Sequence, residues 1–153
     1  MITAVRIGLL LLAAAVSASC AKSSGVIFSP DGISSPVVWS REEMEKEIAQ
    51  RQVSKTQNVS HHVIRLRTHE QPHAHDRHDL TVFQLSGKAR IHLNGKSYIT
   101  KPGDVMAIPR GTVHWAENLD PQSSEVYAVF VPPYDGKDSR TVEASRPVRN
   151  PKP

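Results

Sequence analysis

The sequence of 153 residues has one cysteine, Cys20, so the chain forms no internal disulfide. It has only three Phe, two Trp and three Tyr, so its core must be built mainly from Val, Ile, Leu and Ala. Its apolar run at residues 7–16 is shorter than the roughly 20 residues of a membrane-spanning helix. The formal charge is +4, with acids interleaved among bases and no basic stripe that includes aromatics. These features argue against a nucleic-acid partner and leave one small domain.

Residues 1–20 have the pattern of a secretory signal rather than of a folded segment. MITAVR carries one positive charge, the apolar run follows, and SASC ends it with small residues. A buried N-terminal helix is the alternative. VSASC resembles the lipobox of bacterial lipoproteins, with Ser17 where that motif usually has Leu, and this resemblance implies a lipidated Cys20. Ordinary cleavage near Ala18 or Ala21 competes with lipidation. The expected location is therefore the bacterial periplasm, either free or attached to a membrane.

Residues 21–57 are predicted to be a tether followed by a short helix. Ser, Gly and Pro are spread through residues 21–36, and residues 37–39 are expected to form one short strand. Ser40 and Glu43 have the spacing of a capping box, so a helix is expected over residues 40–52. Met44 and Ile48 lie one turn apart and give it a narrow apolar stripe. At the other end, residues 132–153 hold five of the eleven prolines and are predicted to be an extended or disordered tail.

Between these ends, residues 58–131 read as a succession of short strands. Strands are expected at residues 80–86, 88–93, 96–100, 105–108, 113–118 and 125–131, with turn residues between them. Asn94-Gly95 is the strongest short signal for a hairpin. Within KARIHL, Ala89, Ile91 and Leu93 alternate with polar residues. Strands at intervals of eight to twelve residues predict an all-β sandwich or closed barrel.

Histidines and an aspartate gather in QPHAHDRHDL, residues 71–80. His73 and His75 are two apart, so they point to the same side of an extended segment. Period two places Asp79 on one face with Thr81 and Phe83, and this face is expected to point into the core. A carboxylate at the rim of an apolar interior is costly unless it is paired or bound to a metal. The residues predict half of a site for a divalent metal, and His114, after a turn, is the candidate from another strand.

Two stretches resemble the motifs of the cupin superfamily. HAHDRHDLTVFQLSG is similar to the first motif, and GDVMAIPRGTVHWAEN is similar to the second, with fifteen residues between Gly87 and Gly103. The resemblance implies a double-stranded β-helix, a small jelly-roll-like barrel, here with a short N-terminal helix. It implies a metal held by four side chains: His73, His75, Asp79 and His114. The family usually has Glu where this chain has Asp79, so binding by the three histidines alone stays open.

Other readings of the histidines also stay open. His78 follows directly in the same stretch, but period two turns it away from the face of Asp79. Some barrels of this type keep the histidines and bind no metal. The remaining four histidines have no partner pattern and are expected at the surface: His61, His62, His69 and His92.

The expected cofactor is one divalent transition metal, namely Fe, Mn, Ni, Co or Zn. The pocket is expected to be shaped by Thr81, Phe83, Met106 and Trp115, and no strong general base is evident in it. Two functions remain: a small metal-dependent enzyme, most simply a dioxygenase, or a non-catalytic module that binds a small ligand or a metal in the cell envelope. Apolar residues on the outer face of the sheet also predict a homodimer.

Overall fold

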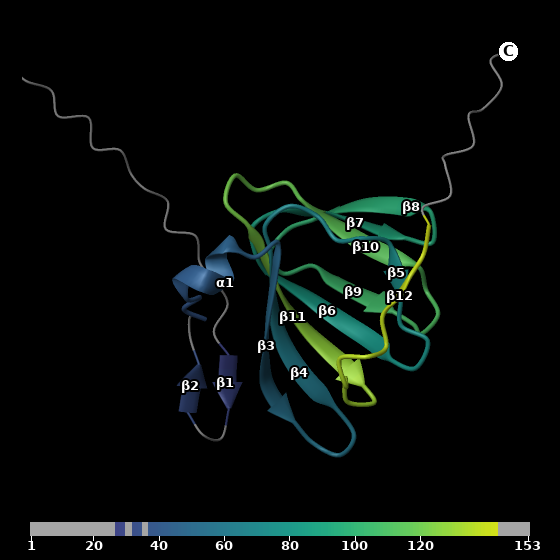
Figure 1. The fold of residues 1–153 in the computed structure, drawn as a ribbon. Coiled ribbons are helices and arrows are strands. Elements are labelled where there is room, and N and C mark those ends of the chain that lie inside the picture. The colour runs from purple at the N-terminus through teal and green to yellow at the C-terminus, as the bar shows by residue number, and fades with distance from the viewer. Residues whose placement is uncertain (1–26, 30–31, 35–36, 144–153) are drawn as a thin grey trace, which may run out of the picture.

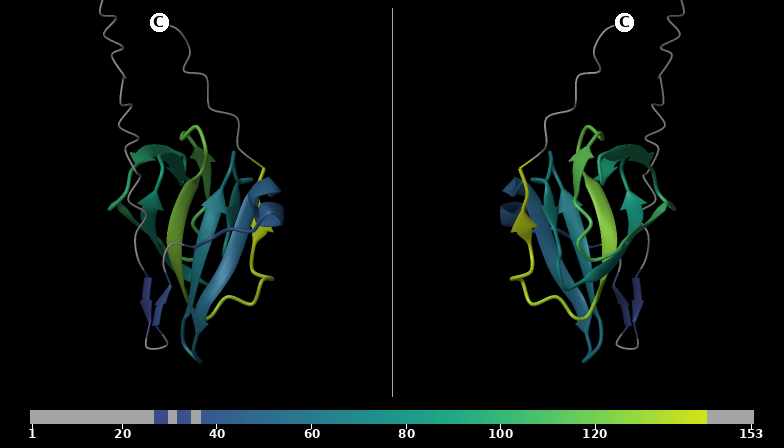
Figure 2. Two further views of the ribbon diagram at one scale, coloured as in Figure 1. Left: turned by 90° about the vertical axis from the view of Figure 1, so that its left-hand side faces the viewer. Right: turned by 90° about the vertical axis from the view of Figure 1, so that its right-hand side faces the viewer.

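A computed structural model describes residues 27–29, 32–34 and 37–143 of the chain. The signal-like segment and Cys20 lie outside these residues. Two five-stranded antiparallel sheets face each other (Figures 1 and 2). One sheet has the order β12 (Arg140–Thr141), β5 (His73–Ala74), β10 (His114–Asn118), β7 (Ala89–Leu93) and β8 (Lys96–Thr100). The other has the order β3 (Ile48–Lys55), β4 (Ser60–Leu66), β11 (Ser124–Val131), β6 (Asp79–Ser86) and β9 (Val105–Ile108). The predicted double-stranded β-helix is thereby confirmed.

The core lies between the inner faces of the two sheets, where alternate residues of each strand meet. Ala89 and Ile91 of β7 are buried there, as their alternation with polar neighbours predicts. The opposite sheet contributes the other side chains of the main cluster, which pack with Ile91: Leu80, Val82, Met106, Ile108, Ala128 and Phe130. Few of these are aromatic, so the core is built of aliphatic residues, as the composition requires.

The turns have the chemistry that the sequence indicates. Asn94 and Gly95 join β7 to β8 with φ angles of 46° and 79°, the left-handed conformations of a tight hairpin. Gly87 lies between β6 and β7 with a φ of 71°, and a side chain there would meet the backbone of Ser123 and Ser124. Glycine at position 87 therefore lets two chain segments come close together.

The N-terminal helix is shorter than its sequence pattern predicts. The capping box is present: the hydroxyl of Ser40 accepts from the backbone N–H of Glu43, and the Glu43 carboxylate accepts from that of Ser40. Helix α1 (Arg41–Glu45) nevertheless ends before Ile48, because the next residues pair with β4 as strand β3. Arg65 of β4 donates hydrogen bonds to three carbonyls at the end of the helix. The barrel thus begins ten residues earlier than expected, and residues 37–39 form no strand.

Residues 132–143, here called the C-terminal strap, lie against the barrel, within the segment predicted to be extended or disordered. After β11 the strap runs back along the molecule and adds β12 beside β5 (Figure 1). Low apolar content is compatible with this arrangement because the strap is held by hydrogen bonds and ion pairs. A separate hairpin is formed by β1 (Ile27–Ser29) and β2 (Gly32–Ser34). Within the described residues, no helix has the length and apolarity to cross a membrane.

Candidate metal centre

The fold brings together three of the four predicted ligands. His73 begins β5 and His75 directly follows that strand, and His114 begins β10, where it pairs in register with His73. One nitrogen atom of each imidazole lies within 4.8 Å of the other two. The ring centroids of His73 and His114 are 4.3 Å apart, and His75 lies 5.1 Å and 5.4 Å from them. The histidine spacing read from the sequence therefore does create a cluster.

Each of the three imidazoles is oriented by a backbone carbonyl. Nδ1 of His73 lies 2.8 Å from the oxygen of Gln71, and Nδ1 of His114 lies 2.9 Å from that of Thr112. Nδ1 of His75 is hydrogen-bonded to the carbonyl of Asp138. A carbonyl only accepts, so Nδ1 carries the proton in all three rings. Nε2 then remains unprotonated and available to a metal. In metal sites, a partner of the other ring nitrogen commonly fixes the tautomer and the orientation of a ligand histidine in this way.

The electrostatics of the cluster also favour neutral imidazoles. Burial lowers the pKa of His114 to about 4, from an ordinary value of 6.5, and also lowers the pKa of His75. Both rings are therefore neutral at neutral pH, as metal binding requires. A set of three imidazole nitrogens suits Fe, Mn, Ni, Co or Zn, and this donor set fits the predicted cofactor.

Asp79, the fourth predicted ligand, lies elsewhere. Its side chain is 47% exposed and accepts hydrogen bonds from the backbone and guanidinium of Arg110, at 2.6–3.2 Å. These bonds hold the pKa of Asp79 at about 2. The first inward-facing side chain of β6 is instead Leu80, which lines the cavity beside the histidines. The cluster therefore consists of three histidines, the alternative that the sequence leaves open.

The displacement of Asp79 follows from a reversed assignment of the faces of β6. Leu80, Val82 and Gln84 are buried, whereas Thr81 is partly exposed and Phe83 is 39% exposed. Both faces of LTVFQL carry apolar residues, so the period alone cannot select the inner one, and a shift by one residue exchanges them. Thr81 and Phe83 are therefore not pocket residues.

Of the other two predicted pocket residues, one lies in the cavity. Met106 lines it, from β9. Trp115 faces outward, where its ring stacks on His92 with centroids 4.2 Å apart, because it alternates with His114 along β10. Asn118 hydrogen-bonds the backbone of Arg67 and Asp120, as expected for a residue that fixes a turn.

The histidines lie in a cavity of about 330 Å³ between the sheets. This volume is at the lower end of the roughly 300–1,000 Å³ typical of small-molecule sites. Most of its wall is apolar, with polar side chains that include Gln84, Thr100 and Ser124. No Lys or Arg side chain lines it among the described residues.

Glu70 is the one carboxylate among the described residues that line the cavity, and the sequence pattern does not single it out. Its Oε2 accepts a hydrogen bond of 3.0 Å from the backbone N–H of Ala116, two residues after His114. Burial raises the pKa of Glu70, and the hydrogen bond from Ala116 opposes this effect. Glu70 precedes β5 in an irregular segment outside both motifs, so no periodicity could place it.

Two histidines outside the cluster are buried. His62, predicted at the surface, is 4% exposed and bonds Ser60 and Gln50. His78 is buried and bonds the carboxylate of Asp138 on the C-terminal strap. His75, His78 and Asp138 form a second group whose ligand atoms lie within 4.8 Å of one another. In this group Nδ1 of His78 already forms a hydrogen bond with the carboxylate of Asp138.

Comparison with known proteins agrees with the fold. Residues 61–130 match the family described as the cupin domain. An uncharacterized protein of Aquifex aeolicus (strain VF5) is 39% identical over 120 residues, which cover 77% of this chain and 98% of that protein. The solved structure of KdgF from Halomonas sp. is 28% identical, with a TM-score of 0.55 over 58% of this chain and 82% of that one. The polyketide cyclase RemF from Streptomyces resistomycificus is 22% identical, with a TM-score of 0.55 over 69% and 78%.

Proposed function

The chain belongs to the cupin superfamily, and from this premise we propose that it is a mononuclear metal-dependent enzyme acting on a small molecule. The ligands are His73, His75 and His114. The observation that carries the proposal is that each Nδ1 donates to a backbone carbonyl. Three separate carbonyls thus leave three Nε2 atoms free in one cavity, which a purely structural cluster would not need.

The chemistry that we propose is that of an oxygenase. A bound divalent metal supplies Lewis acidity and open coordination positions for the oxygen atoms of a substrate or for dioxygen. Because three side chains bind it, more positions stay open than with a fourth protein ligand. In a dioxygenase reaction both atoms of O2 enter the substrate, so no external reductant is consumed. The apolar wall excludes bulk water, and Glu70 is placed to accept or donate a proton at its carboxylate.

The cavity wall indicates the class of substrate. With no Lys or Arg on the described lining, an anionic substrate would find no counter-charge other than a metal. The apolar side chains of Val82, Ile91 and Phe130 favour a compact, uncharged, largely apolar molecule. Two oxygen atoms on adjacent carbons of such a molecule, as in an enediol or a catechol, would suit the open positions.

Metal content tests the proposal first. We expect about one transition metal per purified chain, as measured by mass spectrometry, and its loss in His114→Ala and His73→Ala. Asp79→Ala is the matched control, and we expect it to retain the metal because its carboxylate binds Arg110. Absence of metal from the wild-type protein after reconstitution with each candidate metal would refute the metal centre.

A substrate screen separates the enzyme from a binding module. We would measure oxygen consumption by the metal-loaded protein against small uncharged phenols, catechols and enols, together with Glu70→Gln. If the protein is an enzyme, the wild type consumes one O2 per turnover, and Glu70→Gln turns over more slowly. A non-catalytic module is only stabilised against heat by its ligand, with no turnover in either protein.

We further propose a homodimer that forms through the outer face of the β6 sheet. Phe83 lies between Val105 and Tyr127 on neighbouring strands, and Val131 continues the same face. Phe83, Val105 and Val131 are 39%, 55% and 46% exposed. Apolar side chains gathered in this way favour a protein partner. Light scattering should give twice the chain mass for the wild type and the single mass for Phe83→Asp, and a monomeric wild type would contradict the proposal.

The cell-envelope location is proposed from residues 1–20 alone. We expect cells that express the full chain to incorporate labelled palmitate into it, and Cys20→Ser to abolish the label. A labelled Cys20→Ser variant would show attachment elsewhere, and an unlabelled but exported wild type would favour ordinary cleavage.

A further inference from the structure

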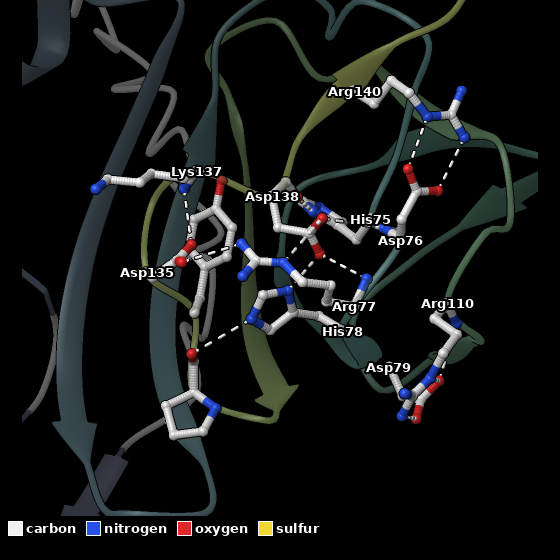
Figure 3. A network of polar contacts seen from close by, with 12 residues as sticks. His75, Asp76, Arg77, His78, Asp79, Arg110, Asp135, Lys137, Asp138 and Arg140 are labelled. Atoms are coloured by element: carbon white, nitrogen blue, oxygen red, sulfur yellow. Dashed lines mark hydrogen bonds and ion pairs between the residues drawn. The ribbon is translucent and has the colours of Figure 1, made fainter.

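The C-terminal strap is attached to the metal-binding loop by a buried carboxylate. Asp138 is 8% exposed, and its Oδ2 lies 2.5 Å from Nδ1 of His78 and 2.8 Å from the backbone nitrogen of Arg77 (Figure 3). Its Oδ1 accepts a hydrogen bond of 3.2 Å from the backbone N–H of Asp76. One side chain therefore satisfies three donors of the segment that joins β5 to β6.

The backbone of the same residue orients a metal ligand. The carbonyl of Asp138 accepts the hydrogen bond from Nδ1 of His75, which leaves Nε2 of that ring for the metal. The carbonyls that orient His73 and His114 belong to residues only two positions before them in the chain. The carbonyl of Asp138 is 63 residues away from His75, so its position depends on how the strap is held.

Ion pairs and strand pairing hold the rest of the strap to the same loop. Arg140 makes two hydrogen bonds to the carboxylate of Asp76, at 2.7 Å and 2.9 Å. Arg77 pairs with Asp135 at 3.0 Å (Figure 3). In addition, β12 pairs with β5. These ion pairs are exposed, and exposed pairs contribute little individually. The buried Asp138 is thus the main polar anchor of the strap.

The strap also forms part of the cavity wall. Tyr134, Ser139 and Thr141 line the cavity. The ring of Tyr134 stacks on Phe130 with centroids 4.7 Å apart, and its edge contacts His75 at 5.5 Å. A displaced strap would therefore expose the histidines to solvent and remove the partner of His75 together.

We propose that Asp138 is a positioning residue, whose carboxylate holds the strap so that its own carbonyl fixes His75 as a metal ligand. The proposal rests on the proposed metal centre, although its first consequence is visible without a metal. Removal of the carboxylate leaves His78 and two backbone N–H groups without their partner, and buried donors without partners are costly. The strap then shifts, and the proton of His75 is free to exchange between its two nitrogens.

The tautomer of His75 in the metal-free protein is the first test. Two-bond proton–nitrogen NMR spectra distinguish Nδ1–H from Nε2–H imidazoles. We expect both His75 and His114 of the wild type to be Nδ1–H. In Asp138→Ala and Asp138→Asn, His75 should become a mixture while His114 stays unchanged, since Thr112 orients it independently of the strap. An unchanged His75 in both variants would overturn the proposal, whether or not the protein binds metal.

Metal affinity is the second test, made by competition for Co²⁺ against a chelator of known affinity. Loss of such outer partners weakens binding by about 10–100-fold. We expect this loss in Asp138→Asn, with an altered Co²⁺ absorption spectrum. Asp135→Asn is the control on the same strap, because Asp135 is exposed and bonds no histidine. A wild type that binds no Co²⁺ would refute the metal centre, whereas equal affinities in wild type and Asp138→Asn would refute only the role of Asp138.

Discussion

Acid should destabilise the metal-free protein through His114. The ring is 4% exposed, and its burial lowers its pKa from 6.5 to about 4. Below pH 6.5 this histidine becomes protonated in the unfolded chain, whereas in the folded chain it stays neutral until about pH 4. More protons are then bound in the unfolded state, so the free energy of unfolding falls as the pH falls through this window. Above pH 6.5 both states are neutral, and His114 adds no dependence on pH.

The size of the effect follows from the shift. A difference of about 2.5 pKa units corresponds to roughly 3 kcal/mol over the whole window. Between pH 7 and pH 5 the share of His114 is about 2 kcal/mol, since the unfolded histidine is almost fully protonated at pH 5 and the folded one is not. Small domains are stable by roughly 5–15 kcal/mol, so a loss of this size is readily measured.

Urea denaturation in the presence of a chelator, at pH 7 and pH 5, measures this loss. We expect the wild type to lose about 2 kcal/mol more than His114→Gln, which cannot titrate. His69→Gln, which replaces an exposed histidine, is the control and should lose as much as the wild type. Equal losses in the wild type and His114→Gln would show that His114 is not held neutral by burial, and the argument for a preformed ligand would fail with it.

Two further predictions concern the frame around the site. Gly87→Ala should lower the free energy of unfolding by about 2–5 kcal/mol, because residue 87 has a left-handed φ and its new side chain would meet the backbone of Ser123. Gly111→Ala is the control: its φ is also left-handed but the space around it is open, so it should cost only about 1–2 kcal/mol. Chemical denaturation measures both. Arg65→Met should destabilise the protein by about 1–3 kcal/mol, because the helix carbonyls lose their buried donor, and equal stability would show that water replaces it.

Local patterns were sufficient to predict most of the fold. Turn residues such as Asn94-Gly95 and the alternation in Ala89–Leu93 are signals contained within a few neighbouring residues. The strands predicted from them are therefore close to those observed. The start of the barrel was missed because IAQRQVSK has no strong period of its own. Its strand conformation comes from pairing with β4, a contact that the local sequence does not encode.

The positions of some site residues likewise follow from the local sequence, whereas those of others depend on contacts with distant segments. His73 and His75 share a side because they are two apart, and the turn before His114 brings it to them, so the sequence could group all three. Asp79 lies outside the histidine group because it stands on the outer face of β6, where its carboxylate bonds Arg110, and the apolar residues on both faces of this strand concealed which face is inside. Period two defines two sets of residues but not which set is inside, and only the packing of the opposite sheet decides this.

The groups that control the histidines come from parts of the chain without any pattern. Glu70 stands in an irregular segment, and Asp138 stands in a tail whose composition predicts disorder. The carboxylates of both accept hydrogen bonds from backbone N–H groups near the site: Glu70 from Ala116 of β10, and Asp138 from Asp76 and Arg77 in the segment between β5 and β6. In the proposed metal centre, the sequence therefore predicts the candidate ligands but not the residues that orient them. It follows that relatives which keep the histidines but differ in these two segments should differ in metal affinity and proton transfer while sharing the fold.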